Sequence, residues 1–206
     1  MGVIERRERE REEVRQKILD AARELFMSEG YEKVTMRRIA EAIEYSPTAI
    51  YLHFEDKDDL VLALCREDFG RLLAVFQKEE LPADPVERIR RLGRAYARFG
   101  LQNPNHYRFM FMTPRSPEHT PEPTDPGHQS FGFLRAAVSD AIESGAFMPS
   151  DPDTVAQVLW AGIHGAMALL IAMRPDCWPR PPAVDLVEQT IEAGVRAFLA
   201  PPTLTR

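Results

Sequence analysis

One stretch constrains the fold of this chain more than any other. It spans residues 34–60 and reads VTMRRIAEAIEYSPTAIYLHFEDKDDL. Thr35 is a good helix N-cap, because its hydroxyl can accept a hydrogen bond from an unpaired backbone N–H of the first turn. After it, Ile39, Ala40 and Ile43 recur at helical spacing. The stretch therefore opens with a short helix that has one apolar face.

A turn at residues 44–46 separates this helix from a second one. Ser46 can cap the second helix, and Pro47 suits its first position because the N–H there has no helical partner. Ile50 and Phe54 are expected to point inward. The side chains expected on the outer face are Thr48, Ala49, Leu52 and His53.

Two helices joined by a short turn form a helix-turn-helix, whose second helix can enter the major groove of DNA. Acidic side chains on that helix would be repelled by phosphates, and residues 46–54 contain no Asp or Glu although charged residues make up 28% of the chain. Tyr51, His53 and Lys57 can each donate to a phosphate oxygen. The pattern predicts a DNA-binding element; an ordinary helical hairpin with a solvated face is the alternative.

Residues 17–64 also resemble the N-terminal domain of the tetracycline-repressor (TetR) family of transcriptional regulators. The residues that carry this resemblance are Ala21, Ala22, Leu25, Phe26, Gly30, Tyr31, Thr35, Ile39, Ala40, Ser46, Ile50, Tyr51, His53, Phe54 and Lys57. Family members usually have glycine in the turn, where this chain has Glu44. Because glycine suits a positive φ, Glu44 is expected to cost about 1 kcal/mol or to reshape the turn slightly.

The resemblance implies roles for individual side chains. Arg37, Thr48 and Ala49 would face bases. Phosphates would be held by Thr35, Tyr51, His53 and Lys57. The predicted DNA-binding set is completed by Arg38, Ser46, Pro47 and Leu52.

Bulk charge does not indicate a nucleic-acid partner. The net charge is -6, and residues 1–57 hold 11 Lys+Arg against 13 Asp+Glu. The DNA prediction therefore depends on the local placement of Arg37, Arg38 and Lys57. A flexible, highly charged N-terminal arm is expected to add Arg6, Arg7, Arg9 and Arg11, interleaved with glutamates. We expect a salt-dependent affinity with a modest number of phosphate contacts.

The rest of the chain predicts further helices and no strands, so the expected fold class is all-α. The expected helices span residues 57–76, 86–101, 104–112, 129–145, 154–173 and 184–199. Residues 113–127 are too rich in proline for a helix and predict a surface loop. We expect a DNA-binding domain at residues 1–56 and an effector-binding and dimerisation domain at residues 57–206.

The last two helices predict a homodimer. Residues 154–173 are apolar nearly all round, which predicts burial on every side, and include the small residues Gly162, Gly165 and Ala166. Pairing of both helices with a two-fold related copy would bury them. Packing within the chain's own core is the alternative.

The middle helices predict a pocket for a flat apolar or aromatic effector, since small-molecule sites are concave and mostly apolar. The candidate lining residues are Tyr96, Phe99, Tyr107, Met110, Phe111, Trp160, His164 and Met167. Simple core packing is the alternative for each. Trp160, His164 and Gly165 also resemble a Trp-His-Gly motif of a ligand-binding subtype within the same family.

No constellation for catalysis, cofactor binding or metal binding occurs in the sequence. The five histidines have no metal-ligand spacing, and two cysteines are too few for a disulfide framework. The N-terminus lacks the apolar core of a signal peptide, and no apolar run of membrane-spanning length is evident. We therefore expect a cytoplasmic protein that is not an enzyme and has no cofactor, metal or membrane partner.

Together these patterns predict a homodimeric transcriptional regulator, a repressor that a small-molecule effector releases from a palindromic DNA operator. A helical module that binds a small molecule or a partner without binding DNA is the alternative. The operator bases, the effector, the target genes and the sign of regulation do not follow from the sequence, because base recognition depends on few side chains and on DNA shape.

Overall fold

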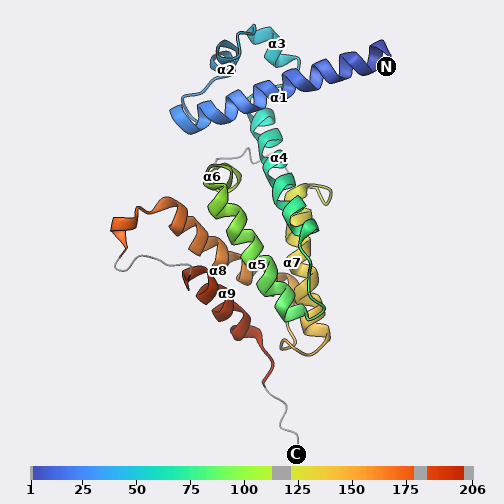
Figure 1. Ribbon diagram of the computed structural model, residues 1–206, viewed down its shortest axis with the longest axis vertical. Helices are drawn as coiled ribbons and strands as arrows, with labels where there is room; N and C mark the ends of the chain where they lie inside the picture. Colours follow the sequence, from blue (N-terminus) through green and yellow to red (C-terminus); the bar gives the residue numbers. More distant parts are fainter. Residues whose placement is uncertain (1, 113–121, 179–184, 202–206) are drawn as a thin grey trace, which may run out of the picture. The chain divides into compact units, whose positions relative to one another are not determined.

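A computed structural model of the chain describes residues 2–112, 122–178 and 185–201 (Figure 1). Its helices are α1 (Val3–Glu29), α2 (Met36–Ala42), α3 (Pro47–Tyr51), α4 (Lys57–Lys78), α5 (Pro85–Gln102), α6 (Pro104–Met112), α7 (Pro126–Glu143), α8 (Pro152–Ala172) and α9 (Asp185–Phe198). Over these residues the other regular elements are a 3-10 turn at Pro175–Cys177 and a single antiparallel bridge between Phe147 and Leu199. The all-α prediction is confirmed.

The predicted loop at 113–127 lies largely outside the described residues. Its last part is described, and α7 begins there at Pro126. The predicted start near Gln129 was therefore three residues late, because proline at the first helical position needs no N–H partner.

The prediction of a frayed N-terminal arm was wrong, because α1 is helical from Val3 onward. After Val3 and Ile4, residues 5–13 are all arginine or glutamate, which are good helix formers. Oppositely charged side chains four residues apart also pair along it, Arg6 with Glu10 at 2.7 Å and Arg9 with Glu13 at 3.9 Å. The high charge that suggested fraying instead stabilises an extended helix.

The chain divides into two compact units, and the division differs from the predicted boundary after residue 56. The first unit contains residues 2–68 and 108–112, and the second contains residues 69–107, 122–178 and 185–201. The start of α4 belongs to the first unit because Leu60 and Leu64 are fully buried in its core. The assignment of functions to the two units remains a prediction.

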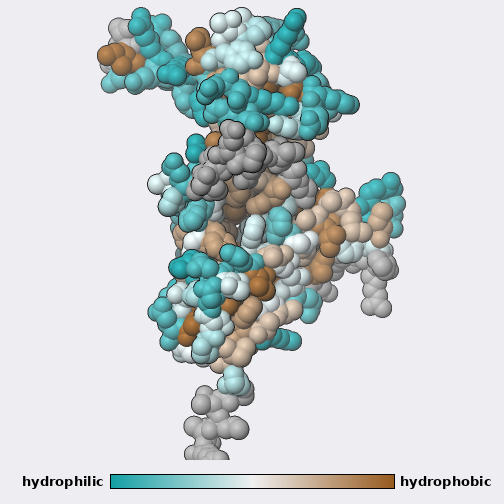
Figure 2. All heavy atoms as spheres, turned by 180° about the vertical axis from the view of Figure 1, so that it is seen from behind, coloured by the Kyte–Doolittle hydropathy of each residue, from teal (hydrophilic) through white to brown (hydrophobic). Residues whose placement is uncertain are grey.

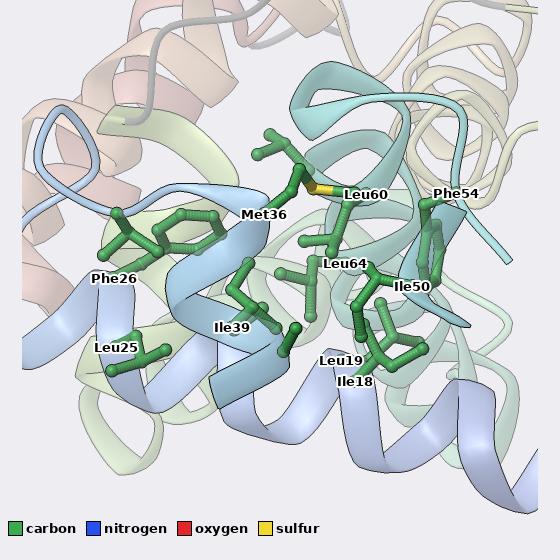
Figure 3. Close-up of a cluster of buried hydrophobic side chains, with 14 of the residues drawn as sticks. Ile18, Leu19, Leu25, Phe26, Met36, Ile39, Ile50, Phe54, Leu60 and Leu64 are labelled. Atoms are coloured by element: carbon green, nitrogen blue, oxygen red, sulfur yellow. The ribbon is translucent and has the colours of Figure 1, made fainter. Parts of the chain in front are cut away.

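The core of the first unit forms where one side of α1 meets α2, α3 and the start of α4 (Figure 3). Ile18 and Leu19 of α1, Ile39 of α2 and Ile50 of α3 have exposed fractions of 1% or less. Their side chains point toward one another in Figure 3. This packing fixes the orientation of α3, so the inward placement predicted for Ile50 is confirmed.

The turn between α2 and α3 keeps the left-handed geometry although it lacks glycine. Glu44 has φ 59°, the one positive φ of a non-glycine residue in the described parts of the chain. The Tyr45 N–H donates to the Ala40 carbonyl at 2.9 Å, and the Glu44 N–H donates to the Glu41 carbonyl at 3.3 Å. These two bonds form a Schellman motif, which needs a left-handed residue at the position of Glu44. Glu44 therefore adopts the strained conformation and leaves the turn unchanged.

Replacing Glu44 by glycine should raise the free energy of unfolding by about 1 kcal/mol, because glycine adopts a positive φ without the steric cost of a Cβ. Urea unfolding of the two proteins would measure this difference. Glu44→Ala provides the control: it removes the same charge but keeps the Cβ, so it should give little or no gain. Equal stability of the glycine and alanine variants would contradict the strain.

In the second unit, α5 packs against α7, α8 and α9. Glycines allow close approach at two crossings. A Cβ built on Gly93 of α5 would lie 3.1 Å from Ile191 of α9, and one on Gly194 of α9 would lie 2.9 Å from Leu159 of α8. Ion pairs across α5 and α9 join Arg90 to Glu192 and Arg94 to Glu188.

Helix α8 is not buried on every side, contrary to the prediction. Val158 is 50% exposed and Leu169 48% exposed. Also contrary to our reading of the sequence, α8 is long and apolar enough to cross a membrane by length and composition. Those two properties are shared by core helices of soluble proteins, and α8 packs on α5, α7 and α9 within its unit.

Candidate nucleic-acid interface and effector site

Both helices of the predicted DNA-binding element are capped as the sequence indicated. The Thr35 hydroxyl accepts from the Arg38 N–H at 3.1 Å, and the Ser46 hydroxyl accepts from the Ala49 N–H at 3.2 Å. Pro47 is the first residue of α3. These caps hold two short helices that are only seven and five residues long.

The outer surface of α3 is open to solvent. Tyr51 is 54% exposed and Leu52 is 70% exposed, and Ser46, Pro47 and Thr48 are also exposed, whereas Ala49 is half-buried. On α2, the Arg37 side chain is 80% exposed and pairs with Glu41 at 3.1 Å. An apolar side chain as exposed as Leu52 has no role in the core of this unit. The surface therefore offers hydroxyl, guanidinium and apolar groups without an acidic side chain on α3.

Two cations of the predicted DNA-binding set, Lys57 and Arg38, have partners within the first unit. Lys57 donates from Nζ to the Tyr31 carbonyl at 2.5 Å, and its ammonium lies 3.8 Å from the centroid of the Tyr31 ring. Arg38 pairs with Glu29 at 2.7 Å. Both side chains bridge α2 or α4 to the end of α1, so each has a structural role in addition to the predicted one. Contact of either with DNA remains a prediction.

His53 lies at the edge of this surface and is half-buried, not fully outward. Its Nδ1 atom is buried and has no hydrogen-bond partner among the described residues. Burial, followed by the positive charges of Arg11 and Arg15, lowers its pKa. His53 is therefore a neutral imidazole near pH 7, and a phosphate would have to accept from its ring N–H.

In the second unit, four of the predicted effector-binding residues come together. The Tyr107 hydroxyl lies 2.6 Å from Nδ1 of His164, and the Tyr96 hydroxyl lies 3.0 Å from the same atom. The rings of Tyr107 and His164 stack with centroids 5.5 Å apart, and the Trp160 ring lies 5.2 Å from that of His164. We call Tyr96, Tyr107, Trp160 and His164 the aromatic cluster.

Burial sets the ionisation of the aromatic cluster. It raises the pKa of Tyr107 to about 12 and raises the pKa of Tyr96 further, while it lowers the pKa of His164. All three groups are therefore uncharged near pH 7. A neutral imidazole can accept a phenol hydrogen at Nδ1, which fits the 2.6 Å contact from Tyr107. The cluster is a polar network without charge, suited to an uncharged ligand.

The other four predicted pocket residues are distributed differently. Met167 is fully buried, and its Cε and the Tyr107 ring both lie within 3 Å of where a Cβ on Gly100 would be. Phe99 is one of the buried residues of α5. Met110 and Phe111 belong to the first unit. Met167 therefore lies beside Tyr107 of the aromatic cluster, whereas Met110 and Phe111 belong to the other unit.

Acidification should destabilise the protein through His164. Because the folded-state pKa of His164 lies below 6.5, the unfolded state binds the proton more tightly. His164 therefore contributes to the free energy of unfolding in full above pH 6.5, and this contribution is lost as the pH falls through the lower folded-state pKa. Urea unfolding at pH values of about 7.5 and 5 should show a smaller acid loss in His164→Gln than in the wild type. The exposed His128→Gln is the control; equal losses in all three proteins would refute the role of His164.

Two side-chain interactions in the first unit were not predicted from the sequence. Arg23 pairs with Asp68 at 2.5 Å and with Glu67 at 2.9 Å, and Asp68 is fully buried. Arg15 lies over the Phe54 ring, 5.2 Å from its centroid. Arg23 directly follows the buried Ala22. A charged residue beside a buried position was the one sequence signal for an ion pair here. Among the described residues, no group of three or more His, Cys, Asp or Glu is placed to hold a metal ion.

Comparison with known families assigns both parts of the chain. Residues 18–64 match the family model described as bacterial regulatory proteins, tetR family, and residues 89–194, more than half of the chain, match the one described as tetracyclin repressor-like, C-terminal domain. The HTH-type transcriptional repressor Rv1474c of Mycobacterium tuberculosis is 51% identical over 67 residues, which is 32% of this chain and 36% of that protein. The chain thus matches little more than a third of the length of this relative.

Solved structures match over most of the chain. A protein with unknown function from Rhodococcus sp. RHA1 superposes with a TM-score of 0.74 at 24% identity, covering 90% of this chain and 95% of that one. The TetR family transcriptional regulator PfmR from Thermus thermophilus superposes with a TM-score of 0.64 at 25% identity, covering 87% and 94%.

Proposed function

Because the chain belongs to the tetR family of bacterial regulatory proteins, we propose that it is a DNA-binding transcriptional regulator and not an enzyme. In this proposal it is a cytoplasmic repressor that leaves a palindromic operator when a small apolar or aromatic effector binds. The observation that carries the proposal is the solvent-exposed, acid-free outer surface of α3, on which Tyr51 and Leu52 stand clear of the core. Exposed groups on a rigid, capped helix suit insertion into a major groove.

The repressor would be a homodimer formed through α8 and α9. The described outer side of these helices exposes Val158, Ala161, Gly162 and Leu169 on α8 and Ala193 on α9. Tan and brown atoms gather over α8 on the right of Figure 2. Apolar and small side chains together allow a two-fold related copy to pack closely. A dimer would present two α3 helices to two half-sites.

The effector would bind beside the aromatic cluster. Tyr96 and Tyr107 supply hydroxyls, Trp160 supplies an aromatic face, and no formal charge is present among them near pH 7. These groups suit an uncharged aromatic or apolar molecule that carries one polar handle. Membership in the Trp-His-Gly subtype, through Trp160, His164 and Gly165, is part of this proposal.

Effector binding would act on DNA affinity by a population shift. Helix α4 runs without interruption from Lys57 to Lys78, so its residues contribute to both units. A ligand that favours one tilt of α4 would change the separation of the two α3 helices. Half-sites about 34 Å apart could then no longer be occupied together.

Selection of bound duplexes from a random pool, followed by a mobility-shift assay, tests this function. The expected result is a palindrome whose affinity falls steeply with salt and falls again when a molecule from a panel of small aromatic compounds saturates the protein. Recovery of no sequence would refute the DNA-binding function, and operator affinity that every saturating ligand leaves unchanged would refute the switch. A non-DNA binding module would keep its activity in the variant Tyr51→Ala with Lys57→Ala.

A further inference from the structure

Helix α1 begins well before the core that it helps to form. Every side chain from Ile4 to Glu13 is exposed, and Ile18 is the first fully buried residue of the helix. Figure 1 shows the N-terminal turns of α1 continuing past α2 and α3 within the first unit. This exposed extension of about three turns adds nothing to the core packing. Its side chains are therefore available to contact a partner.

One face of this extension lies in line with the face of α1 that packs against α2 and α3. Arg11 precedes Ile18 by seven residues, and Arg7 precedes it by eleven. Both intervals return to nearly the same angle on a helix of 3.6 residues per turn. Because Ile18 faces the core formed with α2 and α3, Arg7 and Arg11 continue that face beyond the core.

One contact and one electrostatic interaction place the start of the Arg7/Arg11 face near the end of α3. The charge of Arg11 contributes to the lowered pKa of His53, which follows α3. The Arg15 guanidinium, one turn after Arg11, lies over the ring of Phe54. The face that carries Arg7 and Arg11 is therefore continuous with the proposed DNA surface at the end of α3.

The ion pairs of the extension are formed by other arginines than Arg7 and Arg11. Arg6 pairs with Glu10 and Arg9 with Glu13, whereas neither Arg7 nor Arg11 has a carboxylate within ion-pair distance in the part of the chain that the structure describes. The carboxylates that flank the face are Glu8, Glu10 and Glu12. Glu8 is exposed, Glu10 pairs with Arg6, and Glu12 lies 3.6 Å from Arg15. Two guanidiniums about 6 Å apart along the helix thus remain available to an anionic partner.

We infer that Arg7 and Arg11 form a second DNA contact, which binds backbone phosphates of the duplex that flanks the bases read by α3. Guanidinium groups bind phosphate oxygens through two parallel N–H donors, and such contacts add affinity without adding base preference. The inference rests on the proposed DNA-binding function. It predicts that the footprint of each protomer reaches beyond its half-site.

The test compares two full-length double variants of equal charge, Arg7→Gln with Arg11→Gln and, as the control, Arg6→Gln with Arg9→Gln. Affinity for the selected operator is measured against salt on a long duplex and on one trimmed to the half-sites. Each phosphate contact contributes about 0.9 to the slope of log affinity on log salt, so four contacts in a dimer would remove roughly 3 to 4. The control should keep the wild-type slope, and Glu8→Gln should bind more tightly than wild type.

On the trimmed duplex, the Arg7/Arg11 variant and the wild type should bind equally well. Two results would overturn the inference while leaving the proposed function in place: equal slopes for both double variants, or the same affinity loss on the trimmed and long duplexes. Absence of salt-dependent operator binding by the wild type would instead overturn both. Circular dichroism of each variant verifies that the helix content is unchanged.

Discussion

Replacing Arg23 by alanine is expected to lower the free energy of unfolding by about 3 to 5 kcal/mol, the usual cost of removing one partner of a buried ion pair. Arg23 of α1 bonds to Asp68 and Glu67 of α4, and its side chain is only 13% exposed. The variant would leave the fully buried Asp68 carboxylate without this guanidinium. Urea unfolding followed by circular dichroism measures the loss.

A surface pair of similar length provides the control. Arg6 and Glu10 lie 2.7 Å apart, but their side chains are 72% and 54% exposed. Because exposed pairs contribute about 0 to 1 kcal/mol, Arg6→Ala should be almost as stable as the wild type. Replacing both charged groups, in Arg23→Met with Asp68→Leu, should recover most of the lost stability. An Arg23→Ala protein as stable as Arg6→Ala would show that the pair does not hold α1 to α4.

Replacing Arg37 by alanine is expected to weaken operator binding by about 1 to 3 kcal/mol per half-site, or roughly 2 to 6 kcal/mol for a palindrome, and to relax the preference for the bases it faces. The side chain is 80% exposed, and the one ion pair that it makes with a described residue, Glu41, is a surface pair. Folding stability should therefore change by no more than about 0.5 kcal/mol. Mobility shifts on the selected operator and on single-base variants measure both effects.

Glu41→Gln separates the DNA contact of Arg37 from its ion pair. This variant frees the Arg37 guanidinium, so the affinity should stay the same or increase. A loss of affinity equal to that of Arg37→Ala would mean that the Arg37–Glu41 pair, and not a DNA contact, is what binding requires. Unchanged affinity in Arg37→Ala would remove this residue from the interface.

Local features of the first unit were predictable because they depend on residues a few positions apart. The caps by Thr35 and Ser46, the inward Ile50 and the left-handed position at Glu44 all follow from single turns and helical periodicity. The same reasoning gave the positions of the later helices to within a few residues. It failed for the start of α1, where side-chain pairing along the helix outweighed the expectation of fraying.

The partners of long charged side chains were not predictable from the sequence, because these partners depend on which helices pack together. Lys57 donates to the carbonyl of Tyr31, twenty-six positions away, and Arg23 bonds to Asp68, forty-five positions away. Such contacts follow from the packing of whole helices, which hydrophobic periodicity constrains only to a face. The same holds for the aromatic cluster, since the sequence supplied its members but not the shared contact at His164.

The sequence by itself determined the helical fold, its caps and the acid-free surface of α3, because each is set by hydrogen bonding and periodicity within about one or two turns. Only the tertiary structure decided which cations stabilise the fold and which remain exposed. A guanidinium is held wherever a packed helix brings a carboxylate within reach, and for Arg7 and Arg11 none of the described carboxylates is so placed.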